Sequence, residues 1–403
     1  MSTIAIIGTL DSKGNEHQFL AEEIRKHGCD TLLIDVGTGG AAQVKPDITR
    51  DEVAQSAGID LAPLIEKNDR GECVTAMSKA APAILTNLHQ QGKIDGVISL
   101  GGGGGTAIAT AGMRALPLGF PKVMVSTLAS GNTAHYLGES DINMMPSIVD
   151  VAGLNQISRN VFRRAAASIC AMTQLQADEQ NDKPLIVASM FGNTTECIEK
   201  AKAILETEGY EVLVFHATGA GGKTMEKLIE TGMVDAVLDL TTTEWADEYV
   251  GGTLSAGASR MDAAKQANIP VVAAPGCLDM VNFGERESVP ETFTGRTFYI
   301  HNPQVTLMRT NAKECAALGE IIATKVNTYG APACIMLPLR GISVISQEGQ
   351  PFHDKDADAA LFDAIRSHSK KPVIEIDDHI NGDVFPIKAA EKLLELIKSH
   401  SNP

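Results

Sequence analysis

Two stretches of this chain repeat the same pattern at a constant offset. Residues 4–7 form a short apolar run that leads through a polar turn and an amphipathic segment to a second apolar run at 28–35, and 185–188 leads in the same way to 209–216. Apolar runs joined by an amphipathic helix are typical of parallel sheets, because parallel strands need a crossover connection. The repeat therefore predicts two tandem domains built alike.

A second pair of similar segments supports this division, since residues 92–98 correspond to residues 232–238. At 403 residues the chain is also longer than one hydrophobic core usually organises. We predict an α/β fold of two tandem Rossmann-like domains with mainly parallel, doubly wound sheets, at 1–178 and 184–403. The polar run 176–184 is the expected hinge, and a ligand site is expected where the two domains face each other.

Composition and charge narrow the class of protein. Hydrophobic residues make up 44% of the chain and aromatic residues only 4%, which indicates an aliphatic core. The formal net charge of -16 and the lack of a basic run disfavour a nucleic-acid-binding surface, because phosphate contacts need clustered lysines and arginines. An anionic ligand stays compatible with this charge where backbone N–H groups and a divalent cation supply positive charge locally.

Cysteine usage and hydropathy indicate the compartment. The seven cysteines are scattered, odd in number and never spaced as Cys-x-x-Cys, which favours reduced thiols that pack as small core residues. No signal-peptide pattern opens the chain, and no run approaches 18 apolar residues without glycine or charge. We therefore expect a soluble cytoplasmic protein that neither enters a membrane nor binds nucleic acid.

Apolar periodicity and helix stop signals place the expected elements. In the first domain we expect a helix near 16–27, an insertion at 41–69 that carries a short helix at 50–56, and a helix at 106–116 after a turn of five glycines. The second domain is expected to add a segment at 296–302 and further strands and helices that the first domain lacks.

In an open parallel sheet, ligands bind beyond the carboxyl ends of the strands. The first loop at that edge, residues 8–14, offers two hydroxyls, a carboxylate and an ammonium ahead of a helix, from Thr9, Ser12, Asp11 and Lys13. Ordinary β–α turns also use such residues as helix caps. The lysine beside hydroxyls and helix amides favours a phosphate site over capping alone.

Glycine-rich turns follow two more strands. The turn after the second strand contains Asp35, Gly37 and Thr38, and an acidic residue at this place of a Rossmann-type fold often holds a ribose, although a plain glycine turn also explains the pattern. The sharpest signal is a run of five glycines before a threonine: Gly101, Gly102, Gly103, Gly104, Gly105 and Thr106. Because consecutive glycines cost conformational entropy, this run indicates a backbone cradle whose N–H groups face an anion.

A fourth loop begins at Ser126 and presents small hydroxyl and amide groups after the next strand. Asp141 and Asn143 lie beyond it, and either side chain can help to hold a magnesium ion through oxygen or water. The pattern does not identify the metal ligands themselves. All four loops at this edge of the sheet carry groups that can bind phosphate. Together they favour a nucleotide as the ligand.

Two familiar fingerprints are incomplete. No Gly-x-Gly-x-x-Gly opens the first helix, so dinucleotide redox chemistry loses support. Residues 217–224 nearly match a P-loop, but Ala217 stands where the first glycine belongs, and the run follows the second strand of its domain. We interpret it as a glycine-rich ligand loop, with Lys223 more typical of a solvated helix start than of a phosphate-binding lysine.

The second domain carries the polar residues that are expected to act on a substrate. A mixed-charge pocket for a carboxylate or phosphate can form from Glu244, Arg260, His301 and Arg309, with the histidine as acid or base. The open alternative is that the arginines pair with helix carboxylates and the histidine caps a turn. Cys277 follows a strand beside glycine, but no base accompanies it in the sequence, which favours a structural role.

These motifs resemble a known family. The chain is similar to the Tm-1-like ATP-binding proteins, also called the UPF0261 family, in five segments: 8–14, 35–40, 101–105, 241–244 and 337–341. The resemblance covers essentially the whole chain. It implies two Rossmann-like domains, ATP with magnesium bound on the first, and a homodimer or higher homo-oligomer.

By matching motif, the resemblance also implies which residues contact the nucleotide: Thr9, Asp11, Lys13, Thr38, Gly101–Thr106 and Ser126. The leading hypothesis is an ATP-binding protein that serves as an ATP-dependent enzyme for a small carboxylate metabolite held between the two domains. The alternative is a non-catalytic, nucleotide-responsive sensor or interaction protein. The sequence identifies neither the metabolite nor the reaction.

Overall fold

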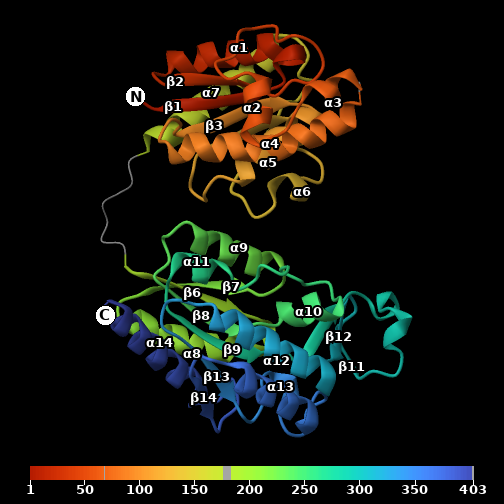
Figure 1. Cartoon of the computed structure of the whole chain (residues 1–403), viewed down its shortest axis with the longest axis vertical. Helices are drawn as coiled ribbons and strands as arrows, with labels where there is room; N and C mark the ends of the chain where they lie inside the picture. The colour runs from red at the N-terminus through yellow and green to blue at the C-terminus, as the bar shows by residue number, and fades with distance from the viewer. Residues whose placement is uncertain (68, 176–182, 402–403) are drawn as a thin grey trace. The chain divides into compact units, whose positions relative to one another are not determined.

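The computed structural model describes three ranges of residues: 1–67, 69–175 and 183–401. The chain divides into two units, Met1–Glu179 and Gln180–Pro403, each with its own sheet and core (Figure 1). We call them unit 1 and unit 2. The expected hinge at 176–184 lies largely outside the described residues.

Unit 1 is built on a parallel sheet. Its strands are β1 (Thr3–Gly8), β2 (Asp30–Asp35), β3 (Gly96–Gly101), β4 (Lys122–Ser126) and β5 (Asn143–Pro146). They lie in the order β2-β1-β3-β4-β5, and every neighbouring pair is parallel. β3 and β4 are buried along their whole length, because helices cover both faces of the sheet.

The helices of unit 1 pack against alternating side chains of the sheet. They are α1 (Leu10–Lys26), α2 (Arg50–Ser56), α3 (Ala62–Glu66), α4 (Arg70–Gln90), α5 (Gly103–Arg114), α6 (Ala134–Leu137) and α7 (Gln156–Gln174). Ile4 and Ile6 of β1 pack with side chains of α1 and α7, whereas Ala5 and Ile7 pack with side chains of α4 and α5. This alternation gives the unit two aliphatic cores, one on each side of the sheet.

Unit 2 repeats the parallel arrangement and extends it. Its strands are β6 (Leu185–Met190), β7 (Glu211–His216), β8 (Ala236–Thr241), β9 (Val271–Gly276), β10 (Met280–Phe283), β11 (Phe298–Asn302), β12 (Val305–Arg309), β13 (Ala333–Pro338) and β14 (Val373–Ile376). The large parallel sheet has the order β14-β13-β9-β8-β6-β7. A small antiparallel sheet has the order β10-β12-β11.

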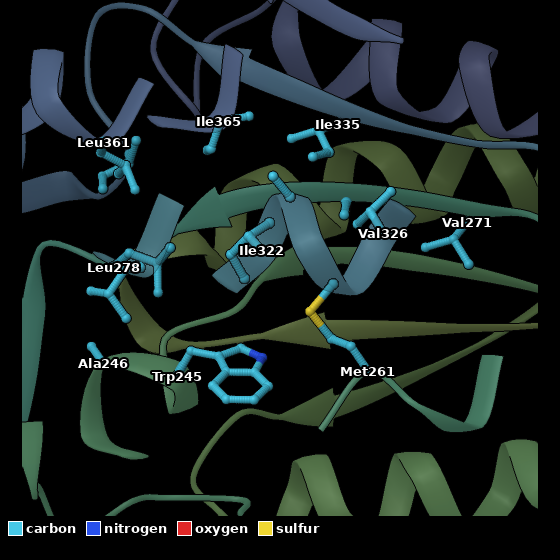
Figure 2. Close-up of a cluster of buried hydrophobic side chains, with 14 of the residues drawn as sticks. Trp245, Ala246, Met261, Val271, Leu278, Ile322, Val326, Ile335, Leu361 and Ile365 are labelled. Carbon is cyan, nitrogen blue, oxygen red and sulfur yellow. The ribbon is translucent and has the colours of Figure 1, made fainter. Parts of the chain in front are cut away.

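Helices again cover both faces of the large sheet. They are α8 (Thr195–Thr207), α9 (Ala220–Glu230), α10 (Glu244–Val250), α11 (Ala263–Ala267), α12 (Ala312–Asn327), α13 (Lys355–His368) and α14 (Phe385–Ser401), with single 3-10 turns at η1 (Gly192–Thr194), η2 (Arg286–Ser288), η3 (Glu291–Phe293) and η4 (Val344–Ser346). α8 and α14 share one core, and α9 to α13 share the other. Figure 2 shows part of the second core, which contains Trp245, Met261 and Ile322.

The repeat predicted from the sequence is confirmed at the level of hydrogen bonds. Ile4 of β1 is paired with Gly96 of β3, and Ile186 of β6 is paired with Ala236 of β8. The equivalent residues Asp95 and Asp235 each accept a hydrogen bond of 2.7 Å from the backbone N–H that opens the neighbouring strand. The predicted α/β fold of two tandem domains with parallel sheets is therefore correct.

Several local expectations need correction. α5 begins at Gly103 rather than at Thr106, so most of the glycine run belongs to the helix instead of a turn. α1 begins at Leu10, with a break at Lys13 where φ is -134° and ψ is 26°, which explains why the sequence resembles a loop up to that point. Neither β5 nor the antiparallel sheet was predicted from the sequence. Each of their strands spans only four or five residues.

All seven cysteines are buried and free of disulfides, as expected for small core residues. Across the described ranges, none of the helices combines the length and the apolar character that a membrane span requires.

One buried carboxylate makes the stability of unit 2 depend on pH. Asp247 in α10 accepts hydrogen bonds from the backbone N–H groups of Asn282 (3.0 Å) and Leu254 (3.2 Å) and from the side-chain amide of Asn282 (2.7 Å). Burial nevertheless raises the pKa of Asp247 from 3.8 to about 6, because the carboxylate is removed from water. The folded protein therefore keeps a proton that the unfolded chain has already released at mildly acidic pH.

We expect the free energy of unfolding of unit 2 to fall as the pH rises through the pKa of Asp247. Between about pH 5 and about pH 7.5, this residue alone should remove about 1 kcal/mol. Urea unfolding followed by the fluorescence of Trp245, the only tryptophan, measures this loss. The Asp247→Asn variant should lose about 1 kcal/mol less over the same range. An equal loss in wild type and variant would contradict the assignment.

Candidate functional site

A cavity of about 510 Å³ lies at the carboxyl edge of the sheet in unit 1. The N-cap and first turn of α1, the turn after β2, the first turns of α4 and α5, and the segment after β5 form its wall. Nine of the residues predicted from the sequence line it together: Thr9, Asp11, Ser12, Lys13, Thr38, Gly102, Gly103, Gly104 and Gly105. The other lining residues are Gly39, Arg70, Cys73, Val74, Ile108 and Asp150.

The first turn of α5 supplies the backbone donors of the cavity. Gly102 is the N-cap residue and has no side chain to cap the helix, and the first helical hydrogen bond runs from the N–H of Thr106 to the carbonyl of Gly102 (2.8 Å). Among the described residues, no acceptor binds the N–H groups of Gly103, Gly104 or Gly105. These three donors, at the positive end of the helix dipole, are suited to an anion.

The protein itself does not require glycine at these positions. None of Gly102–Gly105 has a φ in the left-handed region. An added Cβ at Gly102, Gly103 or Gly105 would lie 3.7 Å or more from its nearest neighbour, and at Gly104 it would lie 3.4 Å from Val74. Since glycine in a helix costs up to about 1 kcal/mol relative to alanine, bare backbone here suggests that something outside the chain approaches it closely.

Two cations face this cavity. Lys13 donates a hydrogen bond to the carbonyl of Val151, and the guanidinium of Arg70 lies beside Gly104. Among the described residues, neither cation forms an ion pair with a carboxylate. The buried arginines of unit 2, Arg260 and Arg309, are both paired. The cavity therefore keeps two charges available for an anionic ligand.

Asp11 connects the first two loops of the cavity. Its Oδ2 accepts the N–H of Gly39 at 2.6 Å, and its backbone carbonyl accepts the side-chain amide of Gln43 at 3.0 Å. A Cβ at Gly37 would lie 2.8 Å from Asp11 Oδ1, so this glycine is needed for the close approach. Oδ1 is buried and accepts no hydrogen bond within the described protein, which leaves it for a donor or a cation.

Other predicted contacts support the cavity from behind its wall. Asp35 is buried, and its Oδ1 accepts the N–H groups of Leu10 (3.1 Å) and Gly37 (2.8 Å), although burial raises the pKa of its carboxyl. It therefore ties the loops after β1 and β2 together, and its expected place against a ribose needs correction. Gly37 itself packs against Asp11 and does not line the cavity.

Thr106, Ser126 and Gly101 also lie behind the wall. The hydroxyls of Thr106 and Ser126 are buried and hydrogen-bonded to each other at 2.7 Å, which fastens the first turn of α5 to the end of β4. Gly101 ends β3, and a Cβ there would lie 3.1 Å from the backbone of Gly105. These residues position the glycines, and none of them lines this cavity.

The two oxygen ligands considered beyond β4 are placed differently from the expectation. Asp141 accepts hydrogen bonds from the ammonium of Lys122 (2.6 Å) and from the N–H of Gly119 (2.7 Å), so both of its oxygens have protein partners. Asn143 is exposed on the edge strand β5. Neither residue lines the cavity.

In unit 2, a carboxylate of the chain itself occupies the loop that resembles a P-loop. Glu244 Oε1 accepts the N–H groups of Gly219 (2.7 Å) and Gly222 (3.1 Å), which are the donors at the start of α9. A Cβ at Gly222 would overlap with Glu244, and one at Gly221 would overlap with the carbonyl of His216. The glycines here serve internal packing, so interpreting 217–224 as a ligand loop was wrong.

Arg260 completes this internal network. Its guanidinium is 1% exposed and donates to Glu244 Oε2 (2.8 Å), to both oxygens of Asp239 (2.7 and 2.8 Å) and to Glu226 (3.1 Å). Burial raises the pKa of the Glu226 carboxyl. With its donors directed at three carboxylates, Arg260 has a structural role here.

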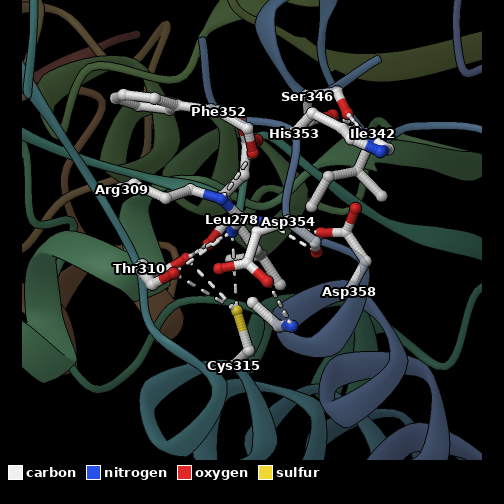
Figure 3. A network of polar contacts seen from close by, with 12 residues as sticks. Leu278, Arg309, Thr310, Cys315, Ile342, Ser346, Phe352, His353, Asp354 and Asp358 are labelled. Atoms are coloured by element: carbon white, nitrogen blue, oxygen red, sulfur yellow. Dashed lines mark hydrogen bonds and ion pairs between the residues drawn. The ribbon is translucent and has the colours of Figure 1, made fainter. Parts of the chain in front are cut away.

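Arg309 and His301 lie apart from this network in the contacts described. Arg309 is buried and donates to Asp358 (2.6 Å), to the carbonyl of Phe352 (2.7 Å) and to the hydroxyl of Thr310 (3.0 Å), as Figure 3 shows. His301 is exposed on β11. The four residues therefore do not form the expected mixed-charge pocket, and their catalytic role stays a prediction.

Cys277 fits the structural role that was favoured. Its side chain is fully buried, burial raises the pKa of its thiol, and its N–H donates to the carbonyl of Ile342 at 2.9 Å. A thiol in this environment is protonated at neutral pH and is not a nucleophile.

Arg70 and Asp150 are the charged residues of the cavity that the sequence analysis missed. Arg70 follows the inserted segment and opens α4, whose N-cap Asp69 accepts the N–H of Glu72 at 3.0 Å. Asp150 lies after β5, a strand that was not predicted. The N-cap residue Asp69 indicates in the sequence that a helix starts at Arg70. No local pattern indicates that the start of this helix lies beside the cavity.

We predict that Glu244→Ala destabilises unit 2, because two backbone N–H groups would lose their acceptor and Arg260 would lose one of its carboxylates. The expected loss is about 2 to 4 kcal/mol. Urea unfolding followed by Trp245 fluorescence measures it. The exposed helix residue Glu199 provides the control variant Glu199→Ala, for which we expect a change within about 0.5 kcal/mol. Equal stability of the two variants would contradict the internal role of Glu244.

Comparison with known proteins agrees with the two units. The N-terminal domain model of an uncharacterised protein family, UPF0261, matches residues 2–178, and its C-terminal domain model matches 183–397. A UPF0261 protein of Clostridium tetani is 47% identical over 399 residues, which are 98% of this chain and 99% of that protein. A UPF0261 protein of Rhizobium meliloti is 43% identical and is covered over its whole length.

The ToMV resistance protein Tm-1(GCR237) of Solanum lycopersicum is 36% identical over 415 residues, covering 97% of this chain and 55% of the tomato protein. Among solved structures, a UDP-N-acetylglucosamine 2-epimerase from Rickettsia bellii covers 99% of this chain and 96% of its own, at 11% identity and a TM-score of 0.23. A likeness at that level supports no conclusion about this chain. The family-model matches and the curated relatives show that the chain belongs to the UPF0261 family.

Proposed function

We propose that unit 1 binds ATP together with magnesium, with the phosphates against the first turn of α5. The observation that carries the proposal is the row Gly102–Gly105, which leaves backbone donors bare beside a cavity although neither conformation nor packing requires glycine there. An anion at a helix N-terminus gains both hydrogen bonds and a favourable dipole interaction. A bare backbone lets phosphate oxygens come within hydrogen-bond distance.

The charges around the cavity favour a polyphosphate. Lys13 and Arg70 approach it from different elements, and neither has a carboxylate partner among the described residues. The hydroxyls of Thr9 and Thr38 add neutral donors on the same wall, where the hydroxyl of Ser12 donates to that of Thr9. Two cations and several amides match the charge of a triphosphate better than that of a monocarboxylate. A volume of about 510 Å³ is within the usual range for a small-ligand site.

Magnesium fits the residues of this cavity. Asp11 lies on the wall, and its buried Oδ1 has no hydrogen-bond donor within the described protein. Magnesium is commonly held by one or two carboxylates together with the phosphates of the ligand, and it keeps several waters. Asp11 is therefore the residue that would hold the ion, which would neutralise phosphate charge in a chain with a net charge of -16.

The sequence suggests two hypotheses for how the protein uses the bound nucleotide. Both the ATP-dependent enzyme with a carboxylate substrate and the nucleotide-responsive sensor begin with this binding step. Release of ADP or AMP that a metabolite pool stimulates supports the enzyme, whereas tight binding without turnover supports the sensor. A homodimer or higher homo-oligomer and a cytoplasmic location stay predictions.

A substitution at Gly103 should change stability and affinity in opposite directions. A methyl group at Gly103 would meet its nearest neighbour, Leu128, at 4.0 Å, so Gly103→Ala should stabilise unit 1 by up to about 1 kcal/mol. The same methyl group would lie between the phosphates and the amides, so ATP affinity should fall about tenfold or more, and Gly103→Val should abolish binding. Circular dichroism melting and calorimetry with ATP and magnesium measure the two effects.

Gly192 provides the matched control. It lies in η1 of unit 2, and an added Cβ there would meet nothing within 4 Å. Gly192→Ala should leave the affinity for ATP unchanged. Retained ATP affinity in Gly103→Val would remove the site.

A further inference from the structure

A second cavity adjoins the glycine cavity in unit 1. It has a volume of about 550 Å³ and lies between the ends of β4 and β5. Asp150 lines both cavities, and the hydroxyl of Thr127 lies 3.7 Å from the position that a Cβ of Gly102 would take. The two cavities therefore share a wall at the N-cap of α5. If the phosphates of a ligand lie on the glycines, the adjoining part of that ligand can extend into this second cavity.

The lining of the second cavity differs from that of the first. It consists of Ser126, Thr127, Ser130, Pro146, Ser147, Ile148, Val149 and Asp150. Among the described residues that line it there is no lysine or arginine, and Asp150 at the shared wall is the one charged group. Hydroxyls and apolar carbon atoms form the rest. Such a lining suits an uncharged part of a ligand that has a polar edge, and it is unsuited to phosphate.

Ile148 has an unusual conformation in this lining. Its φ is +67°, in the left-handed region, which a β-branched side chain adopts only under constraint. Two hydrogen bonds hold the neighbouring residues, from the N–H of Ser147 to the carbonyl of Ser126 (3.1 Å) and from the hydroxyl of Ser147 to the carbonyl of Val149 (2.6 Å). The segment is therefore fixed by its surroundings and not by the preference of isoleucine.

Packing within the described protein does not compensate for this strain. The Ile148 side chain is 75% exposed, so it gains little from burial in the protein itself. Glycine or asparagine at this turn would adopt the same backbone without strain. An isoleucine that is both strained and exposed is explained if its side chain packs against a ligand, because strain that persists in a fixed segment is characteristic of binding sites.

We propose that the second cavity takes the base of the nucleotide whose phosphates lie on Gly102–Gly105. Ile148 forms the apolar surface against which the face of the ring packs, and the hydroxyls of Thr127 and Ser130 meet its polar edge. Asp150 at the shared wall then accepts hydrogen bonds from the ribose hydroxyls, which is the role that the sequence suggested for Asp35. The proposal rests on the proposed function and names the part of the ligand that gives selectivity.

The test compares two ligands that differ by the nucleoside. ATP and inorganic tripolyphosphate, each with magnesium, are titrated by calorimetry into the full chain and its variants. Ile148→Asn and Ile148→Gly keep the left-handed turn without strain and remove the apolar surface. Loss of this contact should weaken ATP about tenfold or more. Tripolyphosphate should bind these variants as it binds the wild type.

Two further variants make the outcomes separable. Ile300→Asn replaces an isoleucine that is 61% exposed on β11 of unit 2, and it should change neither affinity. Gly103→Val should abolish the binding of both ligands. Melting temperatures of the Ile148 variants should equal or exceed that of the wild type, since the strain is relieved, so lost affinity cannot reflect misfolding.

A loss of ATP affinity in the Ile148 variants, with tripolyphosphate unchanged, supports the base subsite. Equal weakening of both ligands overturns it, because the segment would then shape the phosphate site instead. Unchanged ATP affinity in these variants also overturns the base subsite. If Gly103→Val then still abolishes the binding of both ligands, the proposed function is retained. If Gly103→Val binds both ligands normally, the proposed function itself fails.

Discussion

The backbone N–H groups in the first turn of α5 have no hydrogen-bond acceptor among the described residues. Such donors are costly when they are left unpaired and favourable beside an anion, where the helix dipole adds to the attraction. The features of unit 1 that surround this turn keep it in place. Asp35 ties the first two loops together, and the bond between Thr106 and Ser126 fastens the turn to β4. Lys13 and Arg70 add full positive charge to a chain that is otherwise strongly acidic.

The two units repeat one topology and treat the same kind of helix start in opposite ways. In unit 2, Glu244 provides the anion from within the chain, and its carboxylate binds the amides at the start of α9. The glycines there are needed because the carboxylate and a carbonyl lie where a side chain would be. In unit 1 no carboxylate of the described residues binds the amides at the start of α5, and the glycines there line a cavity. A shared fold therefore does not imply a shared site.

The sequence predicted what local patterns determine. Apolar periodicity and the match of Asp95 with Asp235 were sufficient to place the strands of the repeat, and the glycine run marked the wall of the cavity, although α5 begins within the run and not after it. Long-range contacts could not be predicted. Glu244 binds the glycine-rich loop of unit 2, and Arg70 lines the glycine cavity of unit 1. Both contacts depend on how segments that are distant in the sequence pack together. The spacing of residues along the chain carries no signal for either.

The central claim concerns three amides, and their NMR resonances test it most directly. The amide signals of Gly103, Gly104 and Gly105 are followed in the full chain while ATP and magnesium are added. The account predicts that these three signals shift most, because each N–H gains a phosphate acceptor, and that Gly219 and Gly222 stay unchanged since Glu244 already binds them. Saturation with ATP that leaves the three signals in place would contradict it.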